Sequence, residues 1–175
     1  MTEACHETAP AAACDDDAMR VPDLGRRGQG WVFLQLILTA AVALAGVSPS
    51  SVTGTPATVL VVLGGALIVA GGVMAFLGVQ ALGPSFTPNP RPLEAGELVE
   101  TGIYRSVRHP IYGGFVLGAL GWGVLNASIP SVALTGLLLL VLYLKSIREE
   151  AWLTDRYPAY PAYRDRTRRF FPGLI

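Results

Sequence analysis

Charged residues are scarce in this chain of 175 residues, and they are missing altogether from two long stretches. They make up 15% of the sequence, whereas an average soluble domain carries roughly 25%. No Asp, Glu, Lys or Arg occurs between Arg27 and Arg91, and none occurs between Arg108 and Lys145. Charge-free stretches of this length are hard to place in a soluble protein. The sequence therefore predicts an integral membrane protein, and its size is that of one domain.

The sequence also has few residues that bind metals and no excess of positive charge. Its two cysteines, Cys5 and Cys14, lie in the N-terminal arm, where only His6 and nearby acids could join them as ligands. A zinc site needs more ligands than this arm offers, so we predict no metal. The formal net charge is zero, which gives no reason to expect a nucleic-acid partner.

Four apolar segments predict an all-α, polytopic membrane protein with four transmembrane helices. Residues 1–30 lack apolar periodicity and are predicted to form a flexible cytoplasmic arm. The predicted spans are residues 31–47, 57–82, 111–127 and 131–147. The second span exceeds the roughly 30 Å hydrocarbon core at 1.5 Å per residue, so we expect it to tilt or to project.

Glycines recur at an interval of one heptad in the second span, at Gly64, Gly71 and Gly78, with Gly65 and Gly72 beside them. This spacing places small residues on one helical face, which allows another helix to approach closely in a membrane. We predict helix packing on this face, with a glycine-lined access groove as the alternative.

The placement of basic residues predicts the topology. All thirteen Lys and Arg residues lie in the N-terminal arm, in the connector 83–110, or at the end of the fourth span and its tail. None lies in the loops 48–56 and 126–130. Because positive residues favour the cytoplasmic side, both termini are predicted to be cytoplasmic. The connector and the tail 148–175 are then expected on the same membrane face, where they can form one site.

The connector ends in a group of residues suited to hold an anion beside a flat ring. Pro110 suits the first turn of the third helix, whose free N–H groups favour negative charge. Arg108 and His109 can donate to the same anion, and Tyr104 and Tyr112 offer flat faces for a heterocycle. The equally weighted alternative is an interfacial loop with aromatic anchors and basic residues.

The tail begins with an acidic pair, Glu149 and Glu150, close to Lys145 and Arg148. The pair either forms a surface salt-bridge cluster, worth little if exposed, or binds a ligand amine or ribose hydroxyls. The aromatic and basic residues that follow it, over 157–169, also suit a membrane-surface anchor.

A long ordered pattern of residues closely resembles the superfamily of isoprenylcysteine carboxyl methyltransferases and phospholipid methyltransferases. It covers roughly residues 83–172. Its parts are Gly102, Tyr104, Arg108, His109, Pro110, Tyr112 and Gly114, then Glu149, Glu150 and Leu153, then Tyr157, Tyr160, Tyr163, Arg166, Arg168 and Pro172.

The resemblance implies a site for S-adenosylmethionine at the cytoplasmic membrane face, without a Rossmann fold. The cofactor-binding residues that it implies are Glu97, Leu98, Val99, Tyr104, His109, Pro110, Tyr112 and Glu149. Among them His109 is expected at the methionyl carboxylate and Glu149 at the amino group. Lys145 and Arg166 are predicted to bind the substrate. Lys145 stands where the family often has arginine, so it keeps the charge and loses the bidentate fork.

The expected activity is methyl transfer to a lipophilic small molecule or a lipid-linked acceptor in a bacterial cell membrane. Glu150 and Arg108 are the predicted catalytic residues, with Glu150 as the general base for an amine or phenol acceptor. The alternatives are a reductase that uses NADPH, related to membrane sterol reductases, and a non-enzymatic scaffold that binds lipid. The sequence leaves the acceptor and the oligomeric state open.

Overall fold

The computed structural model describes residues 21–47, 53–91 and 96–173, and within these ranges it is helical with no extended strand. Its elements are α1 (Gln29–Gly46), α2 (Thr55–Leu82), η1 (Gly83–Ser85), η2 (Gly102–Arg105), α3 (Pro110–Leu125), α4 (Ile129–Arg156) and α5 (Tyr160–Arg166). Three of them, α1, α2 and α4, are long and apolar enough to cross a membrane, and α3 is a shorter apolar helix. The prediction of an all-α polytopic membrane protein is confirmed.

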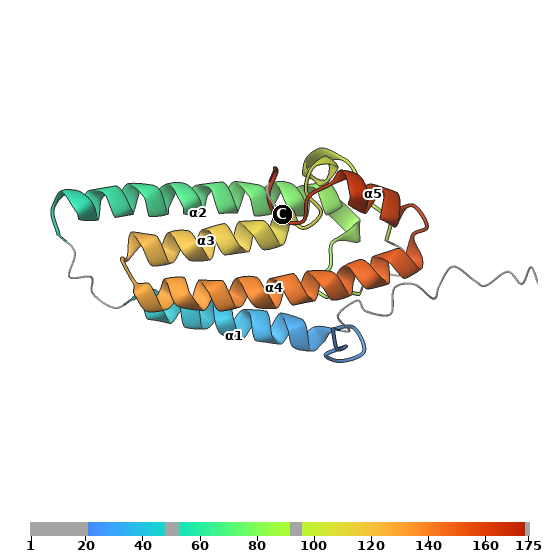
Figure 1. Cartoon of the computed structure of the whole chain (residues 1–175), viewed down its shortest axis with the longest axis horizontal. Coiled ribbons are helices and arrows are strands. Elements are labelled where there is room, and N and C mark those ends of the chain that lie inside the picture. Colours follow the sequence, from blue (N-terminus) through green and yellow to red (C-terminus); the bar gives the residue numbers. More distant parts are fainter. Residues whose placement is uncertain (1–20, 48–52, 92–95, 174–175) are drawn as a thin grey trace, which may run out of the picture.

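The short third helix leaves room at one end of the bundle. With 16 residues, α3 is about 24 Å long, whereas α2 and α4 have 28 residues each. Figure 1 shows α4 continuing well past the start of α3 at the end where α5 lies, whereas α2 extends beyond α3 mainly at the opposite end. The fourth helix continues past the predicted span to Arg156, and η2 and α5 were not predicted. Polar segments fill the space beyond the start of α3.

The three glycines of the predicted heptad stripe on α2 are buried against α3: Gly64, Gly71 and Gly78. A Cβ atom at Gly71 would lie 2.5 Å from the carbonyl oxygen of Gly114 on α3, so the two backbones touch. At Gly72 a Cβ atom would meet nothing within 4 Å. Close helix packing is therefore confirmed for the stripe itself, and it does not extend to the neighbouring glycine.

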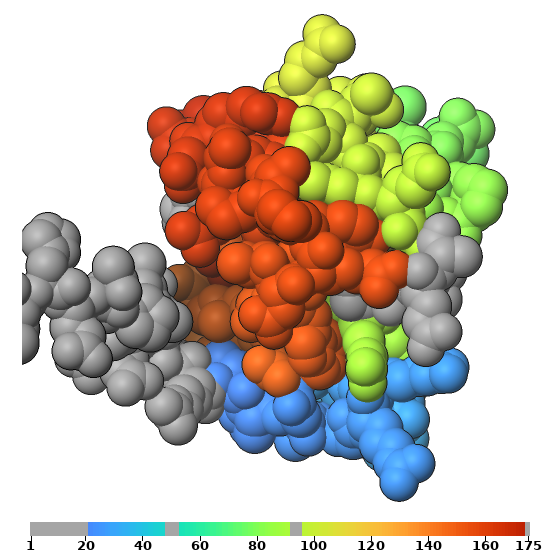
Figure 2. All heavy atoms as spheres, turned by 90° about the vertical axis from the view of Figure 1, so that its right-hand side faces the viewer, coloured from blue at the N-terminus to red at the C-terminus, as the bar shows by residue number. Residues whose placement is uncertain are grey.

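The connector and the tail pair with each other directly, although about sixty positions separate them. Val107 and Arg168 form an isolated parallel β-bridge. The backbone N–H of Arg108 donates to the carbonyl of Arg168 at 2.8 Å, and that of His109 donates to Arg169 at 2.9 Å. Figure 2 shows the tail, the connector and the start of α1 gathered at this end of the bundle. The predicted meeting of connector and tail is thus present in the structure.

Candidate active site

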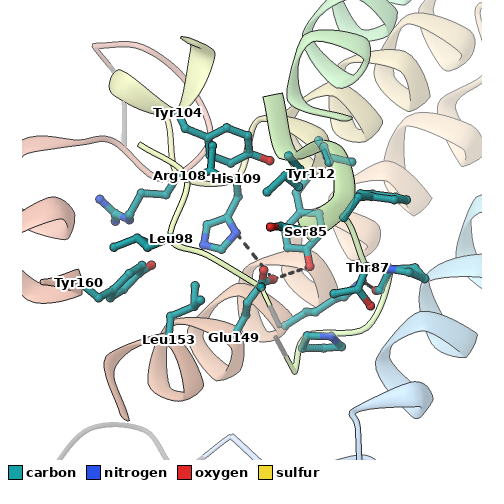
Figure 3. A pocket seen from close by; sticks show the side chains of 18 of the residues that line it. Ser85, Thr87, Leu98, Tyr104, Arg108, His109, Tyr112, Glu149, Leu153 and Tyr160 are labelled. Carbon is teal, nitrogen blue, oxygen red and sulfur yellow. Dashed lines mark hydrogen bonds and ion pairs between the residues drawn. The ribbon is translucent and has the colours of Figure 1, made fainter. Parts of the chain in front are cut away.

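A cavity of about 280 Å³ lies between these polar segments and the ends of α1, α3 and α4. Nine of the predicted site residues line it: Glu97, Leu98, Val99, Tyr104, Arg108, His109, Tyr112, Lys145 and Glu149. Figure 3 shows how several of them converge from different elements. Three other predicted residues, Pro110, Glu150 and Arg166, do not belong to the lining. Pro110 is buried at the start of α3.

One wall of the cavity carries the carboxylate of Glu149. The hydroxyl of Tyr112 donates to its Oε2 at 2.6 Å, and Nδ1 of His109 lies 3.8 Å from the same oxygen. The rings of His109 and Tyr112 stack with centroids 5.3 Å apart. The side chain of Glu149 keeps 24% of its surface exposed, so its carboxylate presents negative charge to whatever enters the cavity.

The next residue, Glu150, lies on the other side of α4 and is buried in an ion cluster. Its Oε1 accepts a hydrogen bond from Nε of Arg108 at 3.0 Å, and its Oε2 accepts one from Arg169 at 3.1 Å. Nε2 of His109 lies 3.0 Å from Oε1. Two guanidinium groups favour the ionised form of this carboxylate. Glu150 therefore links α4, the connector and the tail.

The contact with Glu150 also indicates which ring nitrogen of His109 carries a proton. An ionised carboxylate only accepts hydrogen bonds, so Nε2 carries the proton that it shares with Glu150. Nδ1 is then the ring nitrogen turned toward Glu149 and the cavity. His109 is buried between the two carboxylates, and its 3.0 Å contact with Glu150 is the closer of the two.

The tail contributes tyrosines whose part in the site was not assigned from the sequence. Tyr163 donates to the carbonyl of Tyr104 at 2.8 Å, and Tyr157 donates to the carbonyl of Gly96 at 2.6 Å. Tyr160 also lines the cavity, and its buried hydroxyl has no hydrogen-bond partner among the described residues. The three-residue spacing of these tyrosines was the available signal in the sequence. It could not show which hydroxyls would donate to backbone carbonyls and which would not.

Lys145 is buried on the cavity wall and joins three elements. Its Nζ donates to Oε1 of Gln35 at 2.8 Å and to the carbonyl of Pro88 at 3.2 Å. It also lies 4.8 Å from the centre of the Tyr112 ring. Gln35 was not predicted as a site residue, although a polar side chain inside an apolar span is itself a functional signal.

Apolar side chains line the part of the cavity nearest to the helices. They include Val32 and Leu36 on α1, Phe86 after η1, and Phe115 on α3. Leu36, Phe86 and Phe115 are each at least 40% exposed. The cavity wall is thus continuous with apolar surface of the kind that faces lipid in a membrane protein.

Arg166 lies apart from the cavity, on the surface of α5. It forms an ion pair with Glu100, and 57% of its side chain is exposed. Its predicted contact with the substrate stays a prediction. Among the described residues no group of three or more His, Cys, Asp and Glu side chains is placed to hold a metal ion. Cys5, His6 and Cys14 lie outside the described ranges.

Comparison with known proteins identifies similarity to a family and to individual proteins. The model of the phospholipid methyltransferase family matches residues 59–159. The chain is 39% identical over 79 residues to the nickel-cobalt-cadmium resistance protein NccN of Alcaligenes xylosoxydans xylosoxydans, which is 45% of this chain and 37% of that protein. It is 37% identical over 78 residues to the cobalt-zinc-cadmium resistance protein CzcN of Cupriavidus metallidurans, which is 44% of this chain and 36% of that protein. The chain thus matches little more than a third of the length of either relative.

Proposed function

Since this chain belongs to the phospholipid methyltransferase family, within the isoprenylcysteine carboxyl methyltransferase-like superfamily, we propose that it transfers the methyl group of S-adenosylmethionine to a lipophilic acceptor. The observation that carries the proposal is the cavity in which the connector and the tail meet, with the carboxylate of Glu149 on its wall. We place the protein in a bacterial cell membrane, with the cavity and both termini on the cytoplasmic side.

The residues around the cavity fit S-adenosylmethionine. Its amino group is positively charged and suits the carboxylate of Glu149, while Nδ1 of His109 lies close enough to contact the same end of the molecule. Tyr104 and Tyr112 add aromatic faces to the cavity lining. The cavity volume of about 280 Å³ is near the lower end of the range for small-molecule sites, roughly 300–1,000 Å³.

When bound, S-adenosylmethionine supplies a methyl group on a positively charged sulfur, which is displaced without an acid. The chain's contribution is then mainly to hold donor and acceptor in line, an effect worth roughly 7–11 kcal/mol when the alignment is good. The stacked His109 and Tyr112 rings and the buried Glu150 cluster support this wall of the cavity. A thiolate or carboxylate acceptor would need no general base.

An amine or phenol acceptor would need a base, and Glu150 is the residue proposed from the sequence for this role. It accepts hydrogen bonds from Arg108 and Arg169 and does not line the cavity. To take a proton from an acceptor, it would have to exchange at least one of these partners. This geometry supports acceptors that react without a base, and we propose that Arg108 and Glu150 then position His109.

The apolar part of the lining supports a lipophilic acceptor. Leu36, Phe86 and Phe115 join the cavity to exposed apolar surface, so an acceptor dissolved in lipid has a continuous apolar path to it. Lys145 lines the cavity beside Gln35 of α1, and we propose that it donates to an oxygen of the acceptor. The metal resistance in the names of the two relatives describes no acceptor, so it does not narrow this class.

Ligand binding tests the proposal against its two rivals. The purified protein is expected to bind S-adenosylhomocysteine, the product of the reaction, with micromolar to millimolar affinity in calorimetry. Glu149→Ala and His109→Ala should abolish this binding. Asp155 is an exposed acid on α4, the helix that also carries Glu149, and Asp155→Asn should leave the binding unchanged. Binding of NADPH instead would favour the reductase. Binding of neither, together with affinity for anionic lipid vesicles, would favour the scaffold.

Methyl transfer itself is tested with labelled S-adenosylmethionine and a lipid extract. We expect label to enter the organic phase only when the protein is present, and the loss of this transfer in Glu149→Ala. Identification of the labelled lipid would then show whether the acceptor atom is sulfur, oxygen or nitrogen.

A further inference from the structure

Tyr160 holds a buried polar group that nothing in the described structure uses. Only 1% of the residue is exposed, and its hydroxyl has no hydrogen-bond partner among the described residues. Most buried side-chain polar atoms in proteins have a partner, and leaving one unpaired costs free energy. The ring of Tyr160 also lines the cavity. An unpaired hydroxyl at this place points to a ligand as its partner.

The surroundings of Tyr160 keep its hydroxyl a donor. Burial raises the pKa of Tyr160 above its ordinary value, and the nearby charges of Glu150 and Glu149 raise it further. The phenol is therefore protonated at any physiological pH, and a nearby ligand atom that accepts a hydrogen bond would satisfy it. A positively charged amine could donate to the phenol oxygen, but because it only donates it would leave the O–H of Tyr160 without an acceptor.

The cavity has two chemically different sides. Glu149, His109 and Tyr112 form the charged side, where they interact with one another. Tyr160 lies on the other side, and Figure 3 shows its hydroxyl directed inward, with Leu98 and Leu153 beside it. A charged amino-acid group suits the first side, while a flat, neutral ring with acceptor nitrogens suits the second.

We propose that the Tyr160 hydroxyl donates a hydrogen bond to an acceptor nitrogen in the heterocycle of the methyl donor. The heterocycle then lies between Leu98 and Leu153, on the side of the cavity that carries Tyr160. This inference rests on the proposed function. It divides the cavity into a heterocycle subsite formed by Leu98, Leu153 and Tyr160, and an amino-acid subsite formed by Glu149 and His109.

The tail segment gives Tyr160 a fixed position for this task. Its neighbour Tyr163 is tied to the carbonyl of Tyr104, and the two tyrosine rings meet edge to face with centroids 5.8 Å apart. The β-bridge between Val107 and Arg168 holds the end of the same segment. The hydroxyl is therefore held in place before a ligand arrives, which lowers the entropy cost of forming the bond.

The test compares Tyr160→Phe with the wild type in two measurements on the full chain in detergent. The affinity for S-adenosylhomocysteine should fall about three- to tenfold, as for one lost hydrogen bond. The thermal stability of the ligand-free protein should stay equal or rise, because the substitution removes only a hydroxyl that has no partner. Tyr143→Phe, whose ring lies under Arg169 and outside the cavity lining, is the matched control and should change neither value.

A fragment of the ligand shows which subsite Tyr160 serves. 5′-Methylthioadenosine keeps the heterocycle, so Tyr160→Phe should lower the affinity for it by the same factor as the affinity for S-adenosylhomocysteine. Glu149→Gln should lower the affinity for S-adenosylhomocysteine. Its affinity for 5′-methylthioadenosine should stay within about twofold of the wild type, which is less than the loss of one hydrogen bond would cause.

Three results would overturn the inference. Unchanged affinity in Tyr160→Phe would show that the hydroxyl does not bind the ligand. A fall in ligand-free stability would show that the hydroxyl has a structural partner instead. A loss confined to S-adenosylhomocysteine would place Tyr160 at the amino-acid subsite. If the wild type binds no S-adenosylhomocysteine at all, the proposed function itself fails, and this outcome is distinct from the other three.

Discussion

The apolar bundle and the polar end of this protein are held together by opposite kinds of contact. In the bundle, α2 and α3 meet backbone to backbone at positions such as Gly71 and Gly114, where an added methyl group would clash. At the polar end, the carboxylate of Glu150 collects Arg108 and Arg169 from different segments. At these helix contacts the bundle has no room for an added atom. The polar end depends instead on charged groups that each have a partner.

The same contrast appears between adjacent residues within each region. Successive residues on a helix point about 100° apart. On α2 this turns Gly71 toward α3 and Gly72 into open space. On α4 it turns Glu149 toward the cavity and Glu150 into the ion cluster. Each pair is thus an internal control, because two chemically identical neighbours should respond differently to the same substitution.

The largest expected effect is at the polar end, from Glu150→Ala. Removing one partner of a buried ion pair leaves uncompensated charge and costs about 3–5 kcal/mol. Here Arg108, Arg169 and His109 would all lose the carboxylate that they share. We expect a clearly lower unfolding temperature in detergent, followed by fluorescence, and no binding of S-adenosylhomocysteine.

Glu149→Ala is the matched control for this substitution, since Glu149 is partly exposed and accepts from Tyr112 on the cavity wall. It should abolish ligand binding while the protein stays folded. Equal unfolding temperatures for Glu149→Ala and Glu150→Ala would contradict the different structural roles assigned to these two carboxylates. Glu150→Gln sharpens it, because a variant that folds and binds the ligand but fails only with amine or phenol acceptors would support Glu150 as a general base.

The bundle gives the next largest effect, from the substitution Gly71→Leu. The new side chain would start 2.5 Å from the carbonyl oxygen of Gly114 and would force α2 and α3 apart. Overpacking of this kind costs about 1–3 kcal/mol. Gly72→Leu adds the same side chain to open space and should stay within about 0.5 kcal/mol of the wild type. Thermal unfolding of both variants in the same detergent measures the difference, and equal losses would refute the helix packing.

The features of the fold that were predictable from the sequence are those that depend on the order of residues within one segment. The two stretches without charge gave the helices, the heptad glycines gave the packing face of α2, and the placement of basic residues brought the connector and the tail to one end. These signals need only the periodicity of a helix and the cost of charge in lipid.

The site could be predicted only in part because its remaining features depend on contacts between distant segments. The pairing of Val107 with Arg168 has no local signature. This pairing brings Arg108, which also lines the cavity, into one buried cluster with Glu150, and no local pattern in the sequence shows that cluster. The catalytic roles predicted for both residues stay predictions. Likewise, the pattern of three tyrosines could not show that Tyr157 and Tyr163 bond to backbone carbonyls while the hydroxyl of Tyr160 has no partner among the described residues.

The smallest expected effect comes from Arg166→Ala, at the surface of the polar end. Arg166 pairs with Glu100 where more than half of its side chain is exposed, and an exposed pair is worth about 0–1 kcal/mol. The unfolding temperature should therefore hardly change, in contrast to Glu150→Ala at the same end. The sequence pattern predicts that Arg166 binds the substrate, and this is measured separately as the KM for the acceptor once one is known. A raised KM with unchanged stability would support that role, whereas an unchanged KM would limit the site to the cavity and leave Arg166 as a surface ion pair.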